Sequence, residues 1–546
     1  MKRNLALLAA AAVAAAFVVP MFASDPTLDR IAQALVLAGP AAAAAIASAA
    51  GRPLLSAAAL AALAGYVSGA LALRGVPVPL SVLTGTAAGA ATGAGTAVLL
   101  QRLDAPAFVL ATLLMTIAGG ALVQALPGIT GAQAGLGPLP GVSVPLSAQR
   151  TAVFTPLGDF HVLLAIATLG TAAAVALLHG RVGREWRAVG SDRVRAATTH
   201  VNPLLAEVSV LAIAGALAAL SGAVGAHVAR VATGQGFALD VAALPLLAAL
   251  AAAREPLAAA IVAVATGVLG TVLLPAAGWR GPPDAMSLAI GILALATLLT
   301  LLPSPARRGA EPAYAIDRAR PWPLDSLRLE GGALELAPMQ VRAPNNDVLL
   351  DAPQVTVAAG SVVGIVGPNG SGKTTLLGEI ERLWRRGRLH VETNSGRAAV
   401  VALLPQEGGG FATCSVLETL LLAARHRNAR DALSVADTWL QRLNLQAHAH
   451  ALCAELSAAQ RRTLDLARAV LAEPQVLLCD EPLAGLDDDQ RAACVALLKA
   501  ASNAGLTVVV AEHDREAVSD IASSVVELQR ADTHLVPAVS ASQVTR

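Results

Sequence analysis

Long apolar stretches dominate the first 300 residues or so of the chain, and short polar segments separate them. Most stretches are about 20 residues long, the length that an α-helix needs to cross a hydrocarbon core of about 30 Å. We therefore predict a polytopic α-helical membrane domain of about ten spans. The predicted spans lie near residues 4–23, 31–50, 53–73, 79–101, 105–126, 159–180, 204–228, 236–253, 256–278 and 284–303.

Basic residues in the loops predict the orientation of these spans. Lys2 and Arg3 precede the first span, and the loop from His179 to Pro203 carries five arginines. Lys and Arg concentrate in cytoplasmic loops, so both segments are predicted to be cytoplasmic, and an even number of spans returns the chain there. Five other arginines fall singly on the opposite side, so the bias is incomplete. The first stretch also fits a signal peptide, but the following segment is equally membrane-like, so we expect an uncleaved span.

Ala, Gly, Ser and Thr are frequent in the predicted spans, most densely between Gly85 and Gly95. Small residues let helices approach closely in lipid, so this pattern predicts a tightly packed bundle rather than a substrate site. Ionisable residues are scarce in the spans, where His161 and Asp240 lie near edges. A proton-driven mechanism needs carboxylates at membrane depth, and the sequence gives no support for one.

The pattern changes after residue 303. A Pro- and Arg-rich linker at 304–325 leads into a segment with the polar balance of a soluble domain. Short β-branched runs alternate there with helical stretches, which predicts an α/β core. A helical insert covers about 415–471. We therefore expect a membrane domain at 1–303, a linker at 304–325 and an α/β domain at 326–546, with strands at 361–366, 398–404, 476–479 and 506–511.

A loop in the second half carries the pattern G-x-x-x-x-G-K-[ST]. It follows the predicted strand at 361–366 and opens a predicted helix, the context that a phosphate-binding loop requires. Backbone N–H groups of such a loop surround phosphate oxygens, while its lysine reaches the β- and γ-phosphates and its Ser or Thr hydroxyl binds Mg²⁺. We therefore predict binding of a nucleoside triphosphate with Mg²⁺. The predicted contacts are Gly367, Asn369, Gly370, Ser371, Gly372, Lys373, Thr374 and Thr375, with Thr374 on the metal.

Polar residues end three other predicted strands. Asp480 and Glu481 follow the strand at 476–479, Gln406 follows the strand at 398–404, and His513 follows the strand at 506–511. Ligands collect at the carboxyl ends of strands in an α/β sheet. We predict that Asp480 holds Mg²⁺ and that Glu481 polarises the attacking water. Gln406 is expected to contact Mg²⁺ or the water, and His513 the γ-phosphate.

This order of motifs resembles the nucleotide-binding domain of ABC transporters over about residues 326–530. Leu456-Ser457-Ala458-Ala459-Gln460 matches the signature LSGGQ of that family, and Ala484-Gly485-Leu486-Asp487 matches its D-loop. The resemblance implies that two such domains sandwich two ATP molecules, with the phosphate loop of one facing the signature serine of the other. Ser457 is therefore expected to bind ATP in the site of a partner, and hydrolysis is expected to drive transport.

Three departures from the family pattern concern ATP. Both signature glycines are alanine, and a Cβ at Ala459 is expected to weaken the half-site. No aromatic residue lies between Pro323 and Lys373 to stack on adenine, and Pro344 stands near the expected position. The interval from Lys373 to Gln406 is also short for the family. These departures favour the hypothesis of an asymmetric pair, in which this phosphate loop works opposite a better signature than its own.

The membrane half is similar to the branched-chain amino acid permease family of ABC importers. The similarity lies in Ala107–Leu113, the loop Ile129–Gly141, and Gly183–Val189, which begins a cytoplasmic segment that docks on the ATPase in this family. His200 replaces a family glycine, and the glycine-rich stretch near the ninth span reads Ala248–Glu255. The resemblance implies an importer subunit for branched-chain amino acids or similar small solutes. It also implies a second permease/ATPase chain and an extracytoplasmic solute-binding protein.

Composition and charge limit the alternatives. Charged residues make up 14% and the net charge is +1, which gives no argument for a nucleic-acid partner. We expect a multi-pass protein of the cell (inner) membrane with a cytoplasmic ATPase. One alternative is an ABC half-exporter, which the ten short-looped spans disfavour. Another is a catalytically weakened partner subunit of a heterodimer, which the intact Lys373, Asp480, Glu481 and His513 disfavour.

Overall fold

The structure is a computed structural model. It describes residues 2–147, 150–197, 199, 201–279, 285–301, 316, 321–342, 348–352, 354–393, 399–406, 411–513 and 515–528. The chain divides into two compact units, of which the first comprises Met1–Gly190 and Asn202–Arg307 and the second Ser191–Val201 and Arg308–Arg546. Residues 191–201 therefore belong to the second unit, although they lie between helices of the first in the sequence.

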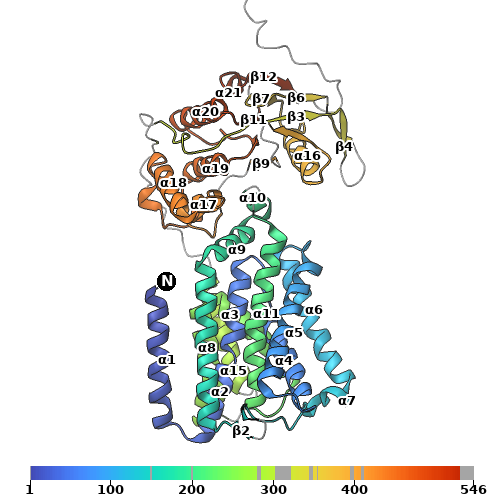
Figure 1. The fold of residues 1–546 in the computed structure, drawn as a ribbon, viewed down its shortest axis with the longest axis vertical. Helices are drawn as coiled ribbons and strands as arrows, with labels where there is room; N and C mark the ends of the chain where they lie inside the picture. Colours follow the sequence, from blue (N-terminus) through green and yellow to red (C-terminus); the bar gives the residue numbers. More distant parts are fainter. Residues whose placement is uncertain are drawn as a thin grey trace, which may run out of the picture. The chain divides into compact units, whose positions relative to one another are not determined.

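Apolar helices build the first unit (Figure 1). In the described part of the chain, six helices are long and apolar enough to cross a membrane, and four shorter apolar helices accompany them. Each overlaps a predicted span, which confirms the polytopic α-helical class, while the number that cross stays a prediction. The longer set is Asp25–Ala49, Val78–Leu100, Ala105–Ala125, Pro156–His179, Pro203–Val228 and Pro256–Ala276, and the shorter set is Ala10–Phe22, Ala57–Ala72, Leu239–Ala251 and Met286–Thr297.

Capping residues define where several of these helices begin. The side chain of Asn202 accepts hydrogen bonds from the backbone N–H groups of Leu204 and Leu205, and Pro203 takes the first helical position of α11. Up to residue 301 the elements are α1 (Lys2–Phe22), α2 (Asp25–Leu35), α3 (Ala38–Ala49), α4 (Ala57–Ala72), α5 (Val78–Leu100), α6 (Ala105–Ala125), α7 (Pro127–Thr130), β1 (Ser143–Ser147), β2 (Arg150–Val153), α8 (Pro156–His179), α9 (Arg181–Ser191), α10 (Arg193–Ala197), α11 (Pro203–Val228), α12 (Leu239–Ala251), α13 (Pro256–Val268), α14 (Leu274–Ala276) and α15 (Ala285–Leu301). Of these, α10 belongs to the second unit.

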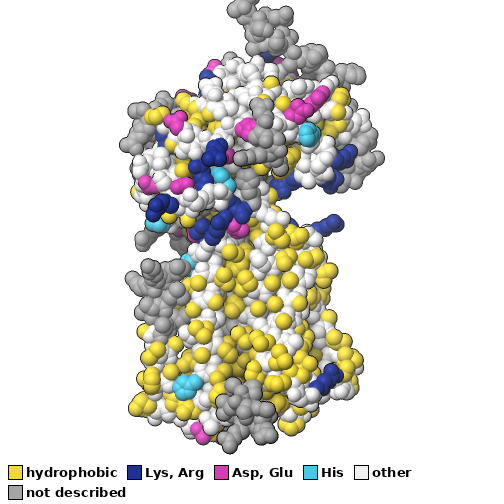
Figure 2. Space-filling view, in the orientation of Figure 1, with side chains coloured by type: hydrophobic (Ala, Val, Ile, Leu, Met, Phe, Trp, Pro, Cys, Tyr) yellow, Lys and Arg dark blue, Asp and Glu magenta, His cyan; other side chains and the backbone are white. Residues whose placement is uncertain are grey.

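Small residues bring the central helices of the first unit together. α11 packs against α3, α4 and α5. A Cβ atom added at Gly93 of α5 would lie 2.0 Å from the carbonyl oxygen of Leu211 in α11, so only glycine permits this approach. The bundle therefore has the close packing that the Gly85–Gly95 pattern indicates. Large apolar side chains such as Leu83, Leu99 and Leu114 point outward, and hydrophobic side chains cover most of the visible face of this unit (Figure 2).

The first unit also buries ionisable groups that the sequence analysis missed. Glu207 of α11 is 3% exposed and pairs with Arg52 at 3.0 Å. His227, at the other end of α11, is fully buried between the hydroxyl of Ser68 (2.9 Å) and the carbonyl oxygen of Pro140 (2.8 Å). Glu207 and His227 lie near the two ends of the predicted span 204–228, so they add to the few ionisable residues found at span edges. Partners supplied by other helices and loops make their burial possible.

The second unit is built on a five-stranded parallel sheet of order β12-β7-β11-β10-β9. A three-stranded antiparallel sheet, β6-β3-β8, and the hairpin β4-β5 accompany it. The strands are β3 (Gly332–Leu336), β4 (Met339–Arg342), β5 (Val348–Ala352), β6 (Val355–Val357), β7 (Val362–Val366), β8 (Val391–Thr393), β9 (Val401–Leu404), β10 (Val476–Asp480), β11 (Thr507–Glu512) and β12 (Ser524–Glu527). The helices are α16 (Lys373–Arg385), α17 (Val416–Ala423), α18 (Ala429–Arg442), α19 (Ala458–Leu471), α20 (Asp488–Asn503) and α21 (Arg515–Ser519).

The parallel sheet buries both of its faces. Alternate residues of β10 divide between two hydrophobic clusters, with Leu477 in the cluster of α19 and α20 and Leu478 in the cluster of α16. The strands therefore read as continuous apolar runs, as buried parallel strands do. This confirms the predicted α/β domain with a helical insert, in which α17, α18 and α19 form the insert. We call these three helices the helical layer.

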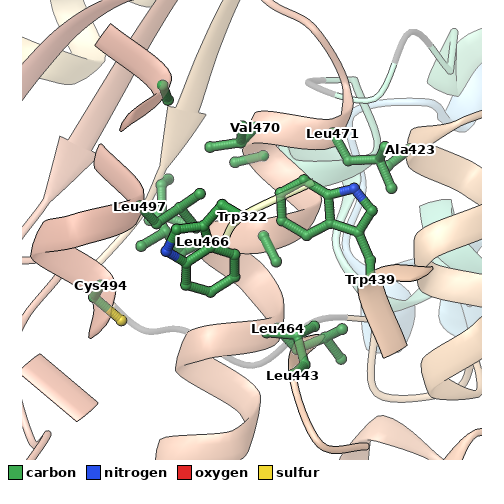
Figure 3. Close-up of a cluster of buried hydrophobic side chains, with 14 of the residues drawn as sticks. Trp322, Ala423, Trp439, Leu443, Leu464, Leu466, Val470, Leu471, Cys494 and Leu497 are labelled. Atoms are coloured by element: carbon green, nitrogen blue, oxygen red, sulfur yellow. The ribbon is translucent and has the colours of Figure 1, made fainter. Parts of the chain in front are cut away.

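Part of the predicted linker packs into the helical layer. Residues 304–315 and 317–320 lie outside the described residues, whereas Ile316, Trp322 and Leu324 are buried in the cluster of the helical layer. Trp322 and Trp439 lie close together (Figure 3), with their ring centroids 5.9 Å apart. The guanidinium of Arg442 lies 3.8 Å from the centre of the Trp322 ring.

Candidate nucleotide-binding site

The phosphate loop connects the buried strand β7 to α16. Gly370 and Gly372 have φ values of 81° and 91°, a region that residues with a Cβ rarely adopt. A Cβ at Gly367 would lie 2.5 Å from the carbonyl oxygen of Leu528. The glycines of the motif are therefore required by the backbone path. Lys373 begins α16, and its Nζ donates to the carbonyl oxygens of Gly367 (2.5 Å) and Pro368 (3.1 Å).

Asp480 ends β10 and is 2% exposed. Neither carboxylate oxygen accepts a hydrogen bond of normal geometry from a residue that the structure describes. Burial raises the pKa of the Asp480 carboxyl, and the neighbouring Glu481 carboxylate adds to this, whereas Thr374 and Lys373 act in the opposite direction. A buried carboxylate with so few donors, of which the Thr374 hydroxyl is one, is costly. A bound cation would offset that cost, so Asp480 fits the predicted Mg²⁺.

Glu481 follows in an unusual backbone conformation, with φ of 44°. Its N–H donates to the carbonyl oxygen of Ala511 at 2.9 Å. The Nε2 of Gln406, which follows β9, donates to Oε2 of Glu481 at 2.8 Å. The predicted water-polarising carboxylate and the predicted Gln406 are therefore in direct contact.

His513 follows β11 and is mostly exposed, with its Nδ1 3.6 Å from Oε2 of Glu512. Glu512 is buried, and its Oε1 accepts from the backbone N–H of Leu483 at 3.2 Å. Burial raises the pKa of the Glu512 carboxyl. Glu512 therefore links the His513 turn to the segment after Glu481, a connection that the sequence analysis did not foresee.

These strand ends and the phosphate loop surround one cavity of about 440 Å³. Gly367 and Ser371 shape the loop without lining the cavity, and Asp480 is buried beside it. None of the lining residues is Phe, Tyr or Trp, and Pro344 lies outside the described residues. The cavity is lined by Asn369, Gly370, Gly372, Lys373, Thr374, Thr375, Gln406, Glu481 and His513, all of which are predicted site residues.

Ser457 does not line this cavity. It caps the N-terminus of α19 instead, where its hydroxyl accepts from Gln460 N (3.2 Å) and Gln460 Oε1 accepts from Ser457 N (2.9 Å). Ala459 packs against the hydrophobic cluster of the helical layer. Its methyl group is therefore engaged in packing within its own domain.

The sequence analysis missed Arg462, a buried residue of α19. Its side chain reaches the backbone of Gln406 and Glu481. A pair of arginines directly after the signature motif was the available signal, since an arginine that faces the core of a helix requires acceptors.

Residues 191–201 contact two elements next to the site. The hydroxyls of Ser191 and Thr413 lie 2.6 Å apart, and Nε of Arg195 lies 3.3 Å from Oδ2 of Asp465 in α19. Asp465 also binds Arg468 at 2.7 Å. Burial alone would raise the pKa of the Asp465 carboxyl, but Arg468 and Arg195 outweigh this effect and lower it.

Two family models match the chain. The model "Branched-chain amino acid transport system / permease component" matches residues 27–298, and the model "ABC transporter" matches residues 350–484. The two matches correspond to the helical unit and to the unit that carries the cavity.

Curated relatives match the second unit. The methionine import ATP-binding protein MetN 2 of Pectobacterium atrosepticum is 32% identical over 222 residues, which cover 36% of this chain and 62% of the relative. The L-cystine import ATP-binding protein TcyN of Bacillus subtilis is 31% identical over 189 residues, covering 32% of this chain and 73% of the relative. The glutamine transport ATP-binding protein GlnQ of Escherichia coli is 30% identical over 190 residues, which cover 32% of this chain and 79% of the relative. The chain spans 62% of the length of the first of these. The chain belongs to the ABC transporter family and joins a branched-chain amino acid transport-type permease domain to an ABC ATP-binding domain.

Proposed function

We propose that this chain is the fused permease and ATPase subunit of an ABC importer for branched-chain amino acids or similar small solutes. The observation that supports this most is the convergence of nine predicted nucleotide-site residues on one cavity, in a chain whose other half matches a permease family. In this proposal residues 1–303 form the permease, 304–325 the linker and 326–546 the ATPase.

The cavity suits ATP hydrolysis with Mg²⁺. The N–H groups of the phosphate loop and Lys373 bind the phosphates, and Thr374, Asp480 and Gln406 are the residues that would hold Mg²⁺. When bound, Mg²⁺ would neutralise part of the phosphate charge. Glu481 accepts a hydrogen bond from Gln406 at 2.8 Å, so its carboxylate is oriented to polarise a water. His513, at the rim, contacts the γ-phosphate.

The position of Ser457 supports a paired arrangement. This serine lies outside the cavity that its own phosphate loop lines, so we assign it to the nucleotide of a partner chain. Two chains then enclose two ATP molecules. Closure around ATP drives the permease halves between inward- and outward-facing states, and hydrolysis resets them. The ATPase lies in the cytoplasm, and the permease lies in the cell (inner) membrane.

The proposed import direction and substrate class rest on the similarity of this chain to known transport proteins. The permease match is to branched-chain amino acid transport, and the named relatives are import or transport ATP-binding proteins. A separate extracytoplasmic solute-binding protein would deliver the solute. A half-exporter is the alternative for direction, and short loops between many apolar helices disfavour it.

An asymmetric pair, with this chain as a catalytically weakened partner, is the second candidate. Its main ground is the replacement of both signature glycines by alanine. Ala459 packs against the hydrophobic core of its own domain. Its methyl group therefore need not project toward the nucleotide, which makes the replacement a weaker argument for an asymmetric pair. We therefore favour a homodimer with two working sites.

The experiment that tests the ATPase is Mg²⁺-dependent phosphate release by the purified chain in lipid nanodiscs. We expect hydrolysis that Lys373→Ala abolishes, because the loop then loses its charge toward the phosphates. Equal turnover in wild type and Lys373→Ala would contradict the proposed site. A dimer in which only one of the two nucleotide sites hydrolyses ATP would favour the asymmetric pair.

A further inference from the structure

We propose that Arg462 is a positioning residue for ATP hydrolysis, whose guanidinium fixes the backbone at the strand ends that carry Gln406 and Glu481. The proposal rests on the proposed ATPase function. It assigns a role to a residue that does not line the nucleotide cavity.

The guanidinium of Arg462 donates hydrogen bonds to five backbone carbonyl oxygens. Its Nε donates to the carbonyl oxygen of Pro482 at 3.1 Å. Nη1 donates to Pro405 at 2.8 Å and to Gln406 at 3.2 Å. Nη2 donates to Asp480 at 2.8 Å and also to Glu481. A guanidinium carries five N–H donors in a rigid fork, so each of its N–H groups has one backbone acceptor here.

These five carbonyl groups belong to the two segments that form the catalytic edge of the sheet. Pro405 and Gln406 follow β9, and Asp480, Glu481 and Pro482 end or follow β10. β9 and β10 are hydrogen-bonded neighbours only as far as Leu404 and Cys479. Beyond that pair, the segments diverge from the ladder, and Arg462 bridges them where the strand-to-strand hydrogen bonds have ended.

Burial makes this bridge rigid. Arg462 is 5% exposed, and it lies on a helix whose other buried residues pack in the cluster of the helical layer. A buried cation is tolerated only when its donors are satisfied. The hydrogen bonds to the carbonyl oxygens of Asp480 and Pro482 are buried, so leaving either carbonyl without a donor carries the cost of an unsatisfied buried group. The five hydrogen bonds therefore define one arrangement of the two segments.

The bridge also explains how Glu481 keeps its conformation. A φ of 44° is unfavourable for a residue with a Cβ and persists only when the surroundings hold it. The Glu481 N–H is bound to Ala511 and its carbonyl oxygen to Arg462. Both flanking peptide groups are thus fixed, which aims the Glu481 carboxylate at the cavity and toward Gln406 Nε2.

The same residue links two sites in the proposed dimer. Ser457 caps α19, and Arg462 lies in the second turn of that helix. Ser457 is assigned to the nucleotide of the partner, while Gln406 and Glu481 face the nucleotide of this chain. A shift of α19 on partner binding would therefore reach Gln406 and Glu481 through one side chain.

The test compares Arg462→Lys with wild type in the full-length chain in nanodiscs. Lysine keeps the charge but has three donors on one nitrogen, so it cannot hold five carbonyls. We expect kcat to fall by at least about tenfold, since ångström-scale misplacement of reacting groups costs up to roughly 100-fold. The KM for ATP and the binding of ATP with Mg²⁺ should stay within about twofold of wild type, because the phosphate loop is untouched. Activity is normalised to titrated ATP-binding sites, which removes any unfolded fraction.

Arg461→Lys is the matched control. Arg461 precedes Arg462 in the same helix, but it donates to the carbonyl oxygens of Ala454 and Leu456, which lie outside the catalytic edge. Its kcat should stay near wild type. A second variant, Arg462→Ala, should regain turnover when free guanidinium is added at a non-denaturing concentration.

Two outcomes overturn the proposal. The first is an Arg462→Lys protein with wild-type kcat. The second is a parallel loss of kcat and ATP binding, which would mean a merely structural role. Turnover that survives Lys373→Ala would instead contradict the proposed function, so the two failures can be told apart.

Discussion

Glu481 lines the cavity, and in the proposed mechanism its carboxylate polarises the attacking water. Its replacement gives the first prediction at the level of single residues. Glu481→Gln keeps the size and the contact with Gln406 but removes the negative charge. We expect ATP turnover to fall about 100-fold or more, while ATP binding persists because Lys373 and the loop are unchanged. Phosphate release and equilibrium ATP binding measure the two effects.

Glu379→Gln is the control for this change. Glu379 lies on α16 and pairs with Arg382, away from the cavity, so its loss should leave turnover near wild type. Wild-type turnover in Glu481→Gln would remove Glu481 from the mechanism.

Ala459 allows a test of how the altered signature motif works. If its methyl group obstructed the partner's nucleotide, Ala459→Gly would raise turnover. Because the methyl group packs against the helical layer, we expect no rise. We also expect a loss of about 0.5–1 kcal/mol of stability from glycine in a helix. Thermal unfolding and turnover of the variant decide between these views, and a severalfold rise in turnover would support the obstructed signature.

At this scale, contiguous motifs were predictable and long-range backbone contacts were not. The phosphate loop can be recognised in the sequence because its glycines, lysine and threonine occur at a fixed spacing. Arg462 binds carbonyl groups 18 to 57 residues away, and any residue type supplies a carbonyl. No side-chain pattern marks such partners. The positive φ of Glu481 was equally unpredictable from the sequence, because glutamate is not a residue type that favours this conformation.

Trp322 joins the chain after the membrane unit to the helical layer. It shares a hydrophobic cluster with Trp439, Leu466 and Val470 (Figure 3). The guanidinium of Arg442 lies over its ring. We expect Trp322→Ala to destabilise the second unit by about 3–5 kcal/mol, the usual cost of truncating a large buried aromatic. Trp322→Phe should recover part of that loss. Chemical denaturation of the purified chain measures it, and unchanged stability in Trp322→Ala would mean that this segment is only a tether.

Glu473, at the end of the helical layer, predicts a pH effect. Burial would raise its pKa, but hydrogen bonds from His426 and Arg427 outweigh burial and lower the pKa from 4.5 to about 2. A carboxyl with a lowered pKa adds stability above its unfolded pKa and loses it as the pH falls toward the folded pKa. Wild type should therefore lose up to about 3 kcal/mol between pH 4.5 and pH 2 from this group.

Glu473→Gln removes the titrating group, so its stability should depend less on pH in that window. Unfolding free energies at several pH values measure the slope. The exposed Glu335→Gln controls for the loss of one carboxylate. An unchanged slope in Glu473→Gln would show that other groups cause the acid sensitivity.

The sequence predicts the boundaries of helices and strands well where the pattern of hydrophobic positions is clear. The predicted strands at 361–366, 476–479 and 506–511 match β7, β10 and β11 closely, because buried parallel strands are continuous apolar runs. The insert at 415–471 was predicted as one helical stretch, yet it contains α17, α18 and α19. Ser415, Asn428 and Ser457 each cap a new helix there. The segment at 322–324 reads as linker, and only the tertiary fold provides the groove that buries Trp322.

At the scale of the whole molecule, hydropathy and motif order were enough to predict a membrane unit followed by an ATP-binding unit. The buried polar contacts of the membrane unit were not predictable, because His227 and Glu207 depend on partners from distant helices and loops. The grouping of residues 191–201 with the second unit was visible only as a basic loop. In the sequence these residues lie between α9 and α11, and α11 contains one of the candidate membrane spans.

Solute uptake is the measurement that tests ATP-driven import most directly. Proteoliposomes enclosing ATP and Mg²⁺ are supplied outside with labelled amino acids, with and without candidate solute-binding proteins. We predict uptake of a branched-chain amino acid or a similar solute that requires enclosed ATP and a binding protein and that Glu481→Gln abolishes. ATP-dependent movement in the opposite direction, or uptake that Glu481→Gln retains, would contradict the account.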